Sequence, residues 1–507
     1  MTKEFQIDSG ILQYTPTGAY YEGRDEQFKR VAQLWTDLFN FDRTMFSLLT
    51  LLNGTGFSKG AMAHMVLSNP LTLHQNFLPI PAELSVDYES KIILHNLNNE
   101  SMPRALKNLL MFTGTEGFPK INNARTRKII LEYIFHRDIR ELDSMAVNFK
   151  GKLKKLIRHA LGKQDLAKIL NGDEKLFMKW IGKYNSYTLP VIWHVFDQDP
   201  PTREGLSAHL PQIEKYWTLR DAAKRGAVEV FRSLMKGFPQ RTVIGFRNTF
   251  NLPIELSEIY ETSSKSTKET IQLEAAAKRS GAKNVTVDWN KQELYDLWKS
   301  FYFKVLSNDI TNIQDVEKAI SEKSDKKLID VGECVVVIDA SRSMFGSDKR
   351  PLHPFLTSLC LVSTIDNIKD IFYVGGKIMK IPSTTVNHVL VPSNSTPLWK
   401  GLVNAVKTGV SKIIVISDGY ENEIKGMFQH TYNHFINEGH KIDLLHLNPV
   451  FAADSKTGTA RRLVSSVTPM PLADYRYLET ELIFNQAIAN RDMVKRLLVN
   501  KYTKLIK

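Results

Sequence analysis

Two carboxylates and three hydroxyls lie at positions where buried strands are expected to end. The segment Asp339-Ala340-Ser341-Arg342-Ser343 has the form Asp-x-Ser-x-Ser and follows an apolar run. Thr396 precedes a predicted helix, and Asp418 follows a second apolar run. Carboxylate and hydroxyl oxygens are hard ligands that suit Mg²⁺ or Mn²⁺. The pattern predicts a metal site that leaves one coordination position for a partner oxygen, and its ligands are Asp339, Ser341, Ser343, Thr396 and Asp418.

The elements that would position these side chains alternate between short apolar runs and helical patterns. The runs that read as buried strands are ECVVVIDA (333–340), IFYVGG (371–376), KIIVISDG (412–419) and HKIDLLHL (440–447), and the helical stretches are 351–365, 398–408 and 424–438. Such alternation predicts an α/β domain over 330–507 with a doubly wound, mostly parallel sheet. Ligands of such sheets bind beyond the carboxyl ends of the strands, where the predicted metal ligands lie. The stretch 477–505 reads as one or two further helices.

A second group of candidate residues is basic. Residues 101–170 hold 15 basic and 6 acidic side chains, a net charge of +9, whereas the whole chain carries +13. A clustered positive charge of this size fits the phosphates of a nucleic acid, although a charge run is more often a solvated face. The residues we predict to contact RNA are Arg125, Arg127, Lys128, Lys152, Lys154, Lys155, Arg158 and His159. Four aromatic side chains could stack on bases or belong to the core, namely Trp180, Tyr184, Tyr187 and Trp193.

Most of the N-terminal part, residues 1–325, reads as a succession of helices. Apolar residues recur at three- and four-residue spacing, for example over 26–53, 124–136, 150–170, 210–237 and 291–305. Many short helices in sequence predict an α-helical repeat of solenoid type, although no clean sequence period is present. Residues 262–288 are polar and poor in aromatics, which predicts a mobile insertion or a solvated helix with loops.

Composition limits the class of protein. A chain of 507 residues with 43% hydrophobic and 24% charged residues has the balance of a globular soluble protein of more than one domain. The sequence shows no signal-like N-terminus and no long apolar run, and it has only two cysteines. We therefore expect a cytoplasmic monomer without a membrane partner.

The sequence does not support catalytic motifs or a histidine metal site. Gly56-Phe57-Ser58-Lys59-Gly60 matches Gly-x-Ser-x-Gly, but the hydrolase motif needs a strand before it, where a helix is predicted. His430 and His434 are spaced like metal ligands but lack a third one. No phosphate-binding loop of NTPases is present, so no enzymatic activity is predicted.

The C-terminal part resembles a von Willebrand factor A domain, because Asp339-x-Ser341-x-Ser343, Thr396 and Asp418 match its metal-ion-dependent adhesion site in order. The whole chain resembles the Ro ribonucleoprotein family, whose helical part is the TROVE module. That similarity is carried by 122–127, 146–162 and 288–302, placed before the A-type domain. It implies a HEAT-like helical ring followed by that domain. It also implies that the protein binds small noncoding (Y-like) or misfolded RNA through the basic surface of its helical part.

Two functions stay open at this point. The resemblance implies an RNA-binding protein that holds Mg²⁺ or Mn²⁺ in its C-terminal domain. The alternative is a scaffold without any RNA role, which would bind an acidic protein ligand through the metal.

Overall fold

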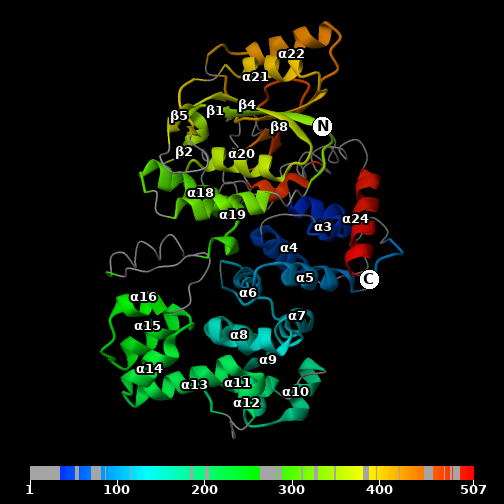
Figure 1. Ribbon diagram of the computed structural model, residues 1–507. Coiled ribbons are helices and arrows are strands. Elements are labelled where there is room, and N and C mark those ends of the chain that lie inside the picture. The colour runs from blue at the N-terminus through cyan, green and yellow to red at the C-terminus, as the bar shows by residue number, and fades with distance from the viewer. Residues whose placement is uncertain are drawn as a thin grey trace. The chain divides into compact units, whose positions relative to one another are not determined.

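The computed structural model describes residues 35–51, 56–69, 81–85, 87–115, 117–182, 187–199, 205–262, 281, 288–309, 312–324, 329–347, 350–380, 388–395, 397–421, 423–449, 461–472, 474–479, 482 and 491–506. Its internal contacts divide the chain into two compact units (Figure 1). The α/β unit comprises Met1–Ser58, Leu73–Pro81 and Trp289–Lys504, and the helical unit comprises Lys59–Thr72, Ala82–Asp288 and Leu505–Lys507. No described helix is long and apolar enough to cross a membrane.

The helical unit is a succession of mostly short helices. They are α4 (Gly56–Ser68, begun in the other unit), α5 (Tyr88–Asn99), α6 (Met102–Met111), α7 (Ala124–Phe135), α8 (Ile139–Asn148), α9 (Lys150–Leu170), α10 (Glu174–Ile181), α11 (Thr188–Val195), α12 (Leu206–His209), α13 (Pro211–Lys224), α14 (Val228–Met235), α15 (Gln240–Thr249) and α16 (Leu256–Thr262). The longest of them, α9, packs against α6, α7, α8, α10 and α11. It therefore lies at the centre of this part of the unit.

The apolar pattern of α9 is the one expected from the sequence. Its buried side chains include Leu153, Leu156, Ile157, Ala160 and Leu161, which recur at three- and four-residue spacing and form one face. Gly162 interrupts the helix with a φ of 77°. Such a positive φ favours glycine because a β-carbon would clash with the backbone. Five lysine or arginine residues of α9 (Lys150, Lys152, Lys154, Lys155 and Arg158) precede this kink, and Lys163 and Lys168 follow it.

The helical unit differs from the sequence prediction in one stretch, 210–237. The predicted helix over 210–237 is two helices, α13 and α14, because the chain turns at Gly226 with a φ of 64°. Most of the polar segment 262–288 lies outside the described residues.

The α/β unit is built on a parallel sheet. Its helices are α3 (Arg43–Leu49), α18 (Leu294–Leu306), α19 (Ile313–Ser324), α20 (His353–Thr364), α21 (Leu398–Lys407), α22 (Met427–Asn437) and α24 (Arg491–Ile506). The main sheet has the order β4-β1-β7-β8-β9, and its strands are β1 (Cys334–Ala340), β4 (Ile368–Gly375), β7 (Lys412–Ile416), β8 (Asp443–Asn448) and β9 (Met470–Pro471). All of these neighbouring strands pair in parallel. Two small antiparallel pairs complete the unit: β2 (Gly346–Ser347) with β3 (Arg350–Pro351), and β5 (Lys377–Lys380) with β6 (His388–Val391).

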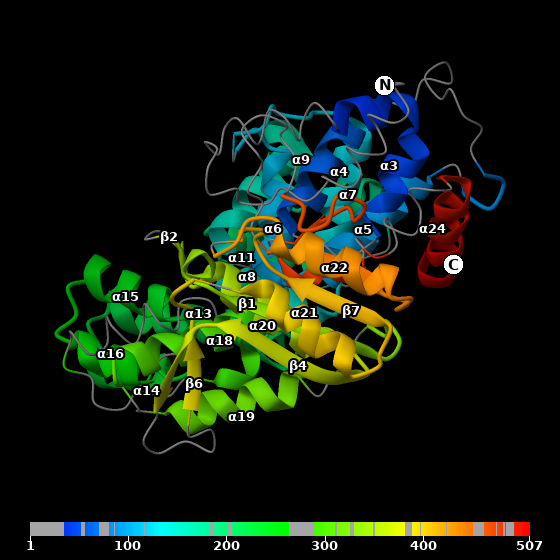
Figure 2. The same cartoon turned by 90° about the horizontal axis from the view of Figure 1, so that it is seen from above.

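Helices cover both faces of the sheet, which places α20 on one face and α21 with α22 on the other (Figure 1). Figure 2 looks onto the second face. Val335 and Val337 of β1 share a buried apolar cluster with Leu402 of α21 and Phe428 of α22. A β-carbon on Gly401 would lie 2.5 Å from Cγ1 of Val337, so glycine allows α21 to approach β1 closely.

The structure therefore contains the predicted strands and crossover helices. β4 differs in burial, because it is at the edge of the sheet and leaves Ile371 and Tyr373 38% and 45% exposed. A continuous apolar run does not distinguish an edge strand from a central one.

The division by contacts also differs from the predicted boundary near residues 325–330. α18 and α19 group with the sheet rather than with the helices before them. The hydroxyl of Tyr302 in α18 donates a hydrogen bond of 2.9 Å to the carbonyl of Leu390. Tyr295 of the same helix places its hydroxyl 2.6 Å from Nδ1 of His353. Side-chain contacts of this kind, rather than the change from helix to strand, mark where the unit begins.

Candidate functional sites

Asp339 lies near the carboxyl end of the interior strand β1 and is fully buried. Its Oδ1 accepts a hydrogen bond of 2.8 Å from the backbone N–H of Ser341. Its Oδ2 accepts one of 2.8 Å from the hydroxyl of Ser417, the residue that follows β7. Both oxygens are therefore fixed by the two loops that leave adjacent parallel strands.

The other predicted ligands that the structure describes join Asp339 at this edge. The hydroxyls of Ser341 and Ser343 are 2.9 Å apart. Asp418 is 3% exposed, accepts a hydrogen bond of 2.9 Å from the backbone N–H of Tyr420, and is hydrogen-bonded by the side chain of Ser343. The fifth predicted ligand, Thr396, lies outside the described residues.

Without a cation, the two buried carboxylates of Asp339 and Asp418 make this cluster electrostatically unfavourable. Burial and the neighbouring Asp418 raise the pKa of Asp339, and burial raises the pKa of Asp418 although Arg461 opposes that shift. A divalent cation between them would offset the repulsion. The Ser341 and Ser343 hydroxyls are hydrogen-bonded to each other at 2.9 Å, and hydroxyl and carboxylate oxygens are both hard ligands of the kind that Mg²⁺ takes. The donor chemistry therefore fits Mg²⁺ or Mn²⁺.

Sequence reasoning missed two residues of this cluster. Ser417 belongs to the apolar run before Asp418, where an inward-facing hydroxyl gives no signal. Arg461 lies far along the chain, and its guanidinium carbon is 3.2 Å from the centre of the Tyr420 ring. Among the described residues, no three His, Cys, Asp or Glu side chains gather as a metal site, so a cation here would depend on the hydroxyls.

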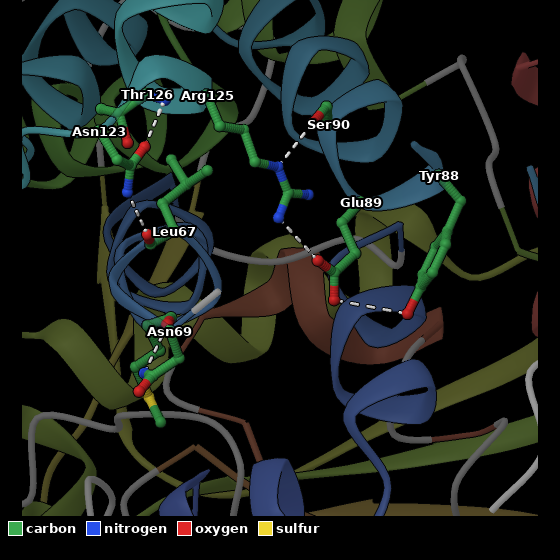
Figure 3. Close-up of polar contacts among 9 residues, drawn as sticks. Leu67, Asn69, Tyr88, Glu89, Ser90, Asn123, Arg125 and Thr126 are labelled. Atoms are coloured by element: carbon green, nitrogen blue, oxygen red, sulfur yellow. Dashed lines mark hydrogen bonds and ion pairs between the residues drawn. The ribbon is translucent and has the colours of Figure 1, made fainter. Parts of the chain in front are cut away.

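The first predicted RNA-contacting residue, Arg125, is held by other side chains. Figure 3 shows it reaching from α7 to α5. Its Nη1 lies 3.0 Å from Oε2 of Glu89, and its Nε donates a hydrogen bond of 2.8 Å to the hydroxyl of Ser90. Glu89 is completely buried. Arg125 thus compensates a buried charge, and its role in the structure is to join two helices.

Asn123 fixes the start of α7 in the same region (Figure 3). Its Oδ1 accepts a hydrogen bond of 2.8 Å from the N–H of Thr126, which is an N-cap. Its Nδ2 donates one of 2.8 Å to the carbonyl of Leu67 in α4. The next basic residues differ from each other: Arg127 donates hydrogen bonds to Oδ1 of Asn122, whereas Lys128 is exposed.

The residues of α9 that were predicted to contact RNA fall into two groups. Three of them make contacts within the unit: Lys152 donates to the carbonyl of Pro103 at 3.2 Å, Nε2 of His159 is 2.9 Å from the carbonyl of Ile121, and Lys154 pairs with Asp197. Lys155 and Arg158 are exposed and lie three residues apart on one side of the helix. These two are the best-placed cations of the predicted set on α9.

The aromatic candidates have structural partners. The indole N–H of Trp180 donates a hydrogen bond of 2.8 Å to Asp165, and that of Trp193 donates one of 3.1 Å to the carbonyl of Leu170. Tyr187 stacks on His209 with ring centres 3.9 Å apart. Tyr184 lies outside the described residues. These contacts favour the packing interpretation for both tryptophans.

Comparisons with known proteins give a likeness to solved structures but no sequence match. No protein-family model matches the chain, and no curated protein sequence matches it. The fold is similar to that in the crystal structure of the Ro (RSR) protein of Deinococcus radiodurans, with a TM-score of 0.42 and 11% sequence identity. The alignment covers 96% of this chain and 100% of that one.

Proposed function

We propose that the protein binds RNA through the basic surface of α9 and is not an enzyme. The observation that carries this proposal is the charge of one helical segment. Between Lys150 and Gln164 the chain has no acidic residue, yet it has six lysine or arginine residues. The apolar face of the same segment is buried, so its cations lie on the remaining sides. A polyanion is the ligand that such a surface suits.

The RNA class proposed is small structured noncoding RNA or misfolded RNA, in the manner of a Ro-type protein. In this proposal the helical unit is a HEAT-like TROVE module and the α/β unit is a von Willebrand factor A domain. Phosphate contacts would be made first by Lys155 and Arg158, which are exposed, and by Lys128 of α7. Arg125 would act indirectly, because its guanidinium is engaged by Glu89.

The same proposal includes a metal-ion-dependent adhesion site in the α/β unit. Asp339, Ser341, Ser343 and Asp418 would hold Mg²⁺ or Mn²⁺, with Thr396 as the fifth ligand. The bound ion would supply a positive charge for an acidic oxygen of a partner. Its support is that two carboxylates and two hydroxyls lie close to one another, since Ser343 is hydrogen-bonded to both Ser341 and Asp418, and Asp418 acts on Asp339.

This site also supports the second candidate function. A metal-dependent scaffold that binds an acidic protein ligand needs only the Asp339–Asp418 cluster and no basic helix. An RNA-binding measurement on the purified protein distinguishes the two functions, because the scaffold function requires no RNA binding.

RNA binding is tested with a fluorescently labelled, structured small RNA and fluorescence anisotropy at low salt. The test variant is the double charge reversal Lys155→Glu with Arg158→Glu. The matched control is Lys224→Glu with Lys236→Glu, which changes the net charge equally at exposed positions of α13 and at the end of α14. We expect the test variant to bind at least about 10-fold more weakly than the control. If the wild-type protein binds no RNA, the RNA-binding proposal is wrong and the metal-dependent scaffold is the remaining candidate function.

A further inference from the structure

One carboxylate reaches the N-terminal part of α9 from the turn that follows α11. Asp197 follows α11, and its Oδ1 lies 2.7 Å from Nζ of Lys150 while its Oδ2 lies 2.6 Å from Nζ of Lys154. The lysines are only 17% and 35% exposed, whereas the carboxylate is 59% exposed. The amines are therefore fixed against the protein, and the anion lies on their outer side.

A third cation belongs to the same group. This cation is Arg158, whose guanidinium carbon lies 5.8 Å from the centre of the Phe196 ring. Nζ of Lys154 lies 5.9 Å from the centre of the same ring. Lys150 also has the ring of Tyr216 at 4.8 Å. Attraction to aromatic faces holds ammonium and guanidinium groups in place even when no anion is bound. The three cations are therefore already in position to bind an anion in the free protein.

The charges of these groups depend on one another. Burial lowers the pKa of Lys150, and hydrogen bonding to Asp197 opposes that shift. Burial also acts to raise the pKa of Asp197, but the two ammonium groups outweigh it and leave that pKa below its ordinary value. The half-buried amine of Lys150 is therefore most stable with an anion beside it.

The backbone at Asp197 is unusual for an aspartate. Its φ of 62° lies in the left-handed region, and the N–H of Gln198 bonds back to the carbonyl of Trp193 in the turn that ends α11. Glycine or asparagine is the usual residue at such a helix end. The contacts of Asp197 explain why a carboxylate is present at this position, because it forms ion pairs with Lys150 and Lys154.

We propose that Lys150, Lys154 and Arg158 form a binding site for one phosphate group of the RNA, and that Asp197 occupies this site in the free protein. The inference rests on the proposed RNA-binding function. A phosphate must displace the Asp197 carboxylate, so the aspartate weakens RNA binding and limits it to ligands with enough other contacts. Lys150 is thereby added to the RNA-contacting residues that the sequence predicted.

Asp197→Asn tests the proposal without disturbing the turn, because asparagine tolerates the left-handed conformation and has the same shape. The matched control is Asp173→Asn, which removes the same charge from an exposed aspartate at the start of α10 and keeps an oxygen for the N-cap hydrogen bond to Leu176. Binding is measured by calorimetry with two probes, a structured small RNA and inorganic tripolyphosphate. Thermal unfolding confirms that each variant is folded.

We expect Asp197→Asn to bind both probes about 3- to 10-fold more tightly than the control, and adding Lys154→Ala to remove that gain. Equal binding by the two single variants to both probes would overturn the inference, whether or not RNA binds. If RNA binds none of the proteins while tripolyphosphate still prefers Asp197→Asn, the anion site stands and the RNA function falls. Weaker binding of both probes by Asp197→Asn would show that the carboxylate supports the site, which also contradicts the proposal.

Discussion

Arg125 and Glu89 form an ion pair of 3.0 Å in which the carboxylate is fully buried and the guanidinium is 29% exposed. Removing the arginine takes the guanidinium away from the buried Glu89 carboxylate, which still accepts a hydrogen bond of 3.4 Å from the Tyr88 hydroxyl. We predict that Arg125→Ala lowers the free energy of unfolding of the helical unit by about 2–3 kcal/mol, because a buried carboxylate that loses its cationic partner is strongly destabilising. Urea unfolding measures this loss.

Lys128→Ala is the control, since Lys128 is exposed on the same helix and should change stability by less than about 0.5 kcal/mol. Weakened RNA binding by Arg125→Ala at full stability would show that Arg125 contacts RNA directly.

Asp143 of α8 caps the start of α13. Its Oδ2 accepts a hydrogen bond of 2.8 Å from the N–H of Gln212, and its Oδ1 accepts one of 2.9 Å from the N–H of Ile213. We predict that Asp143→Ala costs about 1–3 kcal/mol in urea unfolding, since two N–H groups lose their acceptor. Asp143→Asn keeps one acceptor oxygen and should recover part of the loss. A stability of Asp143→Ala equal to that of wild type would show that water replaces this cap.

His194 should make the helical unit sensitive to acid. Its ring is fully buried beside Tyr216 and Trp217. Burial, reinforced by the charges of Lys150 and Arg220, lowers the pKa of His194 to about 3 from 6.5. The unfolded chain therefore binds a proton between these values that the folded chain does not, and stability falls as pH drops below about 6.5.

The variant that tests this prediction is His194→Phe. Its free energy of unfolding should depend on pH less steeply than that of wild type, by up to about 1.4 kcal/mol per pH unit. Urea unfolding between pH 7 and pH 5 measures the slope. His430→Phe, at an exposed position of α22, should keep the wild-type slope. Equal slopes for all three proteins would mean that His194 is protonated without unfolding.

Asp418 should have opposite effects on metal binding and on metal-free stability. Its charge helps to raise the pKa of Asp339, so the two carboxylates repel each other in the absence of a cation. We predict that Asp418→Asn abolishes Mn²⁺ binding in a paramagnetic-resonance titration and leaves the metal-free protein as stable as wild type or more so. Asp366→Asn, in the loop before β4, should bind Mn²⁺ normally. Retained Mn²⁺ binding by Asp418→Asn would remove this residue from the site.

The sequence predicted the parts of the molecule that depend on local pattern. Alternating apolar runs and helices predicted strands β1, β4, β7 and β8 in their chain order, but not their order in the sheet. The strand ends predicted that the Asp339 and Asp418 loops lie close together, and Ser417, next to Asp418, donates a hydrogen bond to Asp339. Contacts between distant residues were not predictable in this way. Glu89 and Asp197 engage Arg125 and Lys154 from other helices, and nothing in the spacing of the basic residues distinguishes them from exposed Lys155.

The RNA-binding surface of α9 is tested most directly by the salt dependence of RNA affinity. The slope of log K against log salt counts the phosphates that the protein neutralises, at about 0.7–0.9 per contact. Exchanging Lys155 and Arg158 for glutamate should lower the magnitude of that slope by about 2, whereas the Lys224 and Lys236 control should leave it unchanged. A wild-type affinity that does not vary with salt, or equal slopes for the two double variants, would contradict an RNA-binding role of this helix.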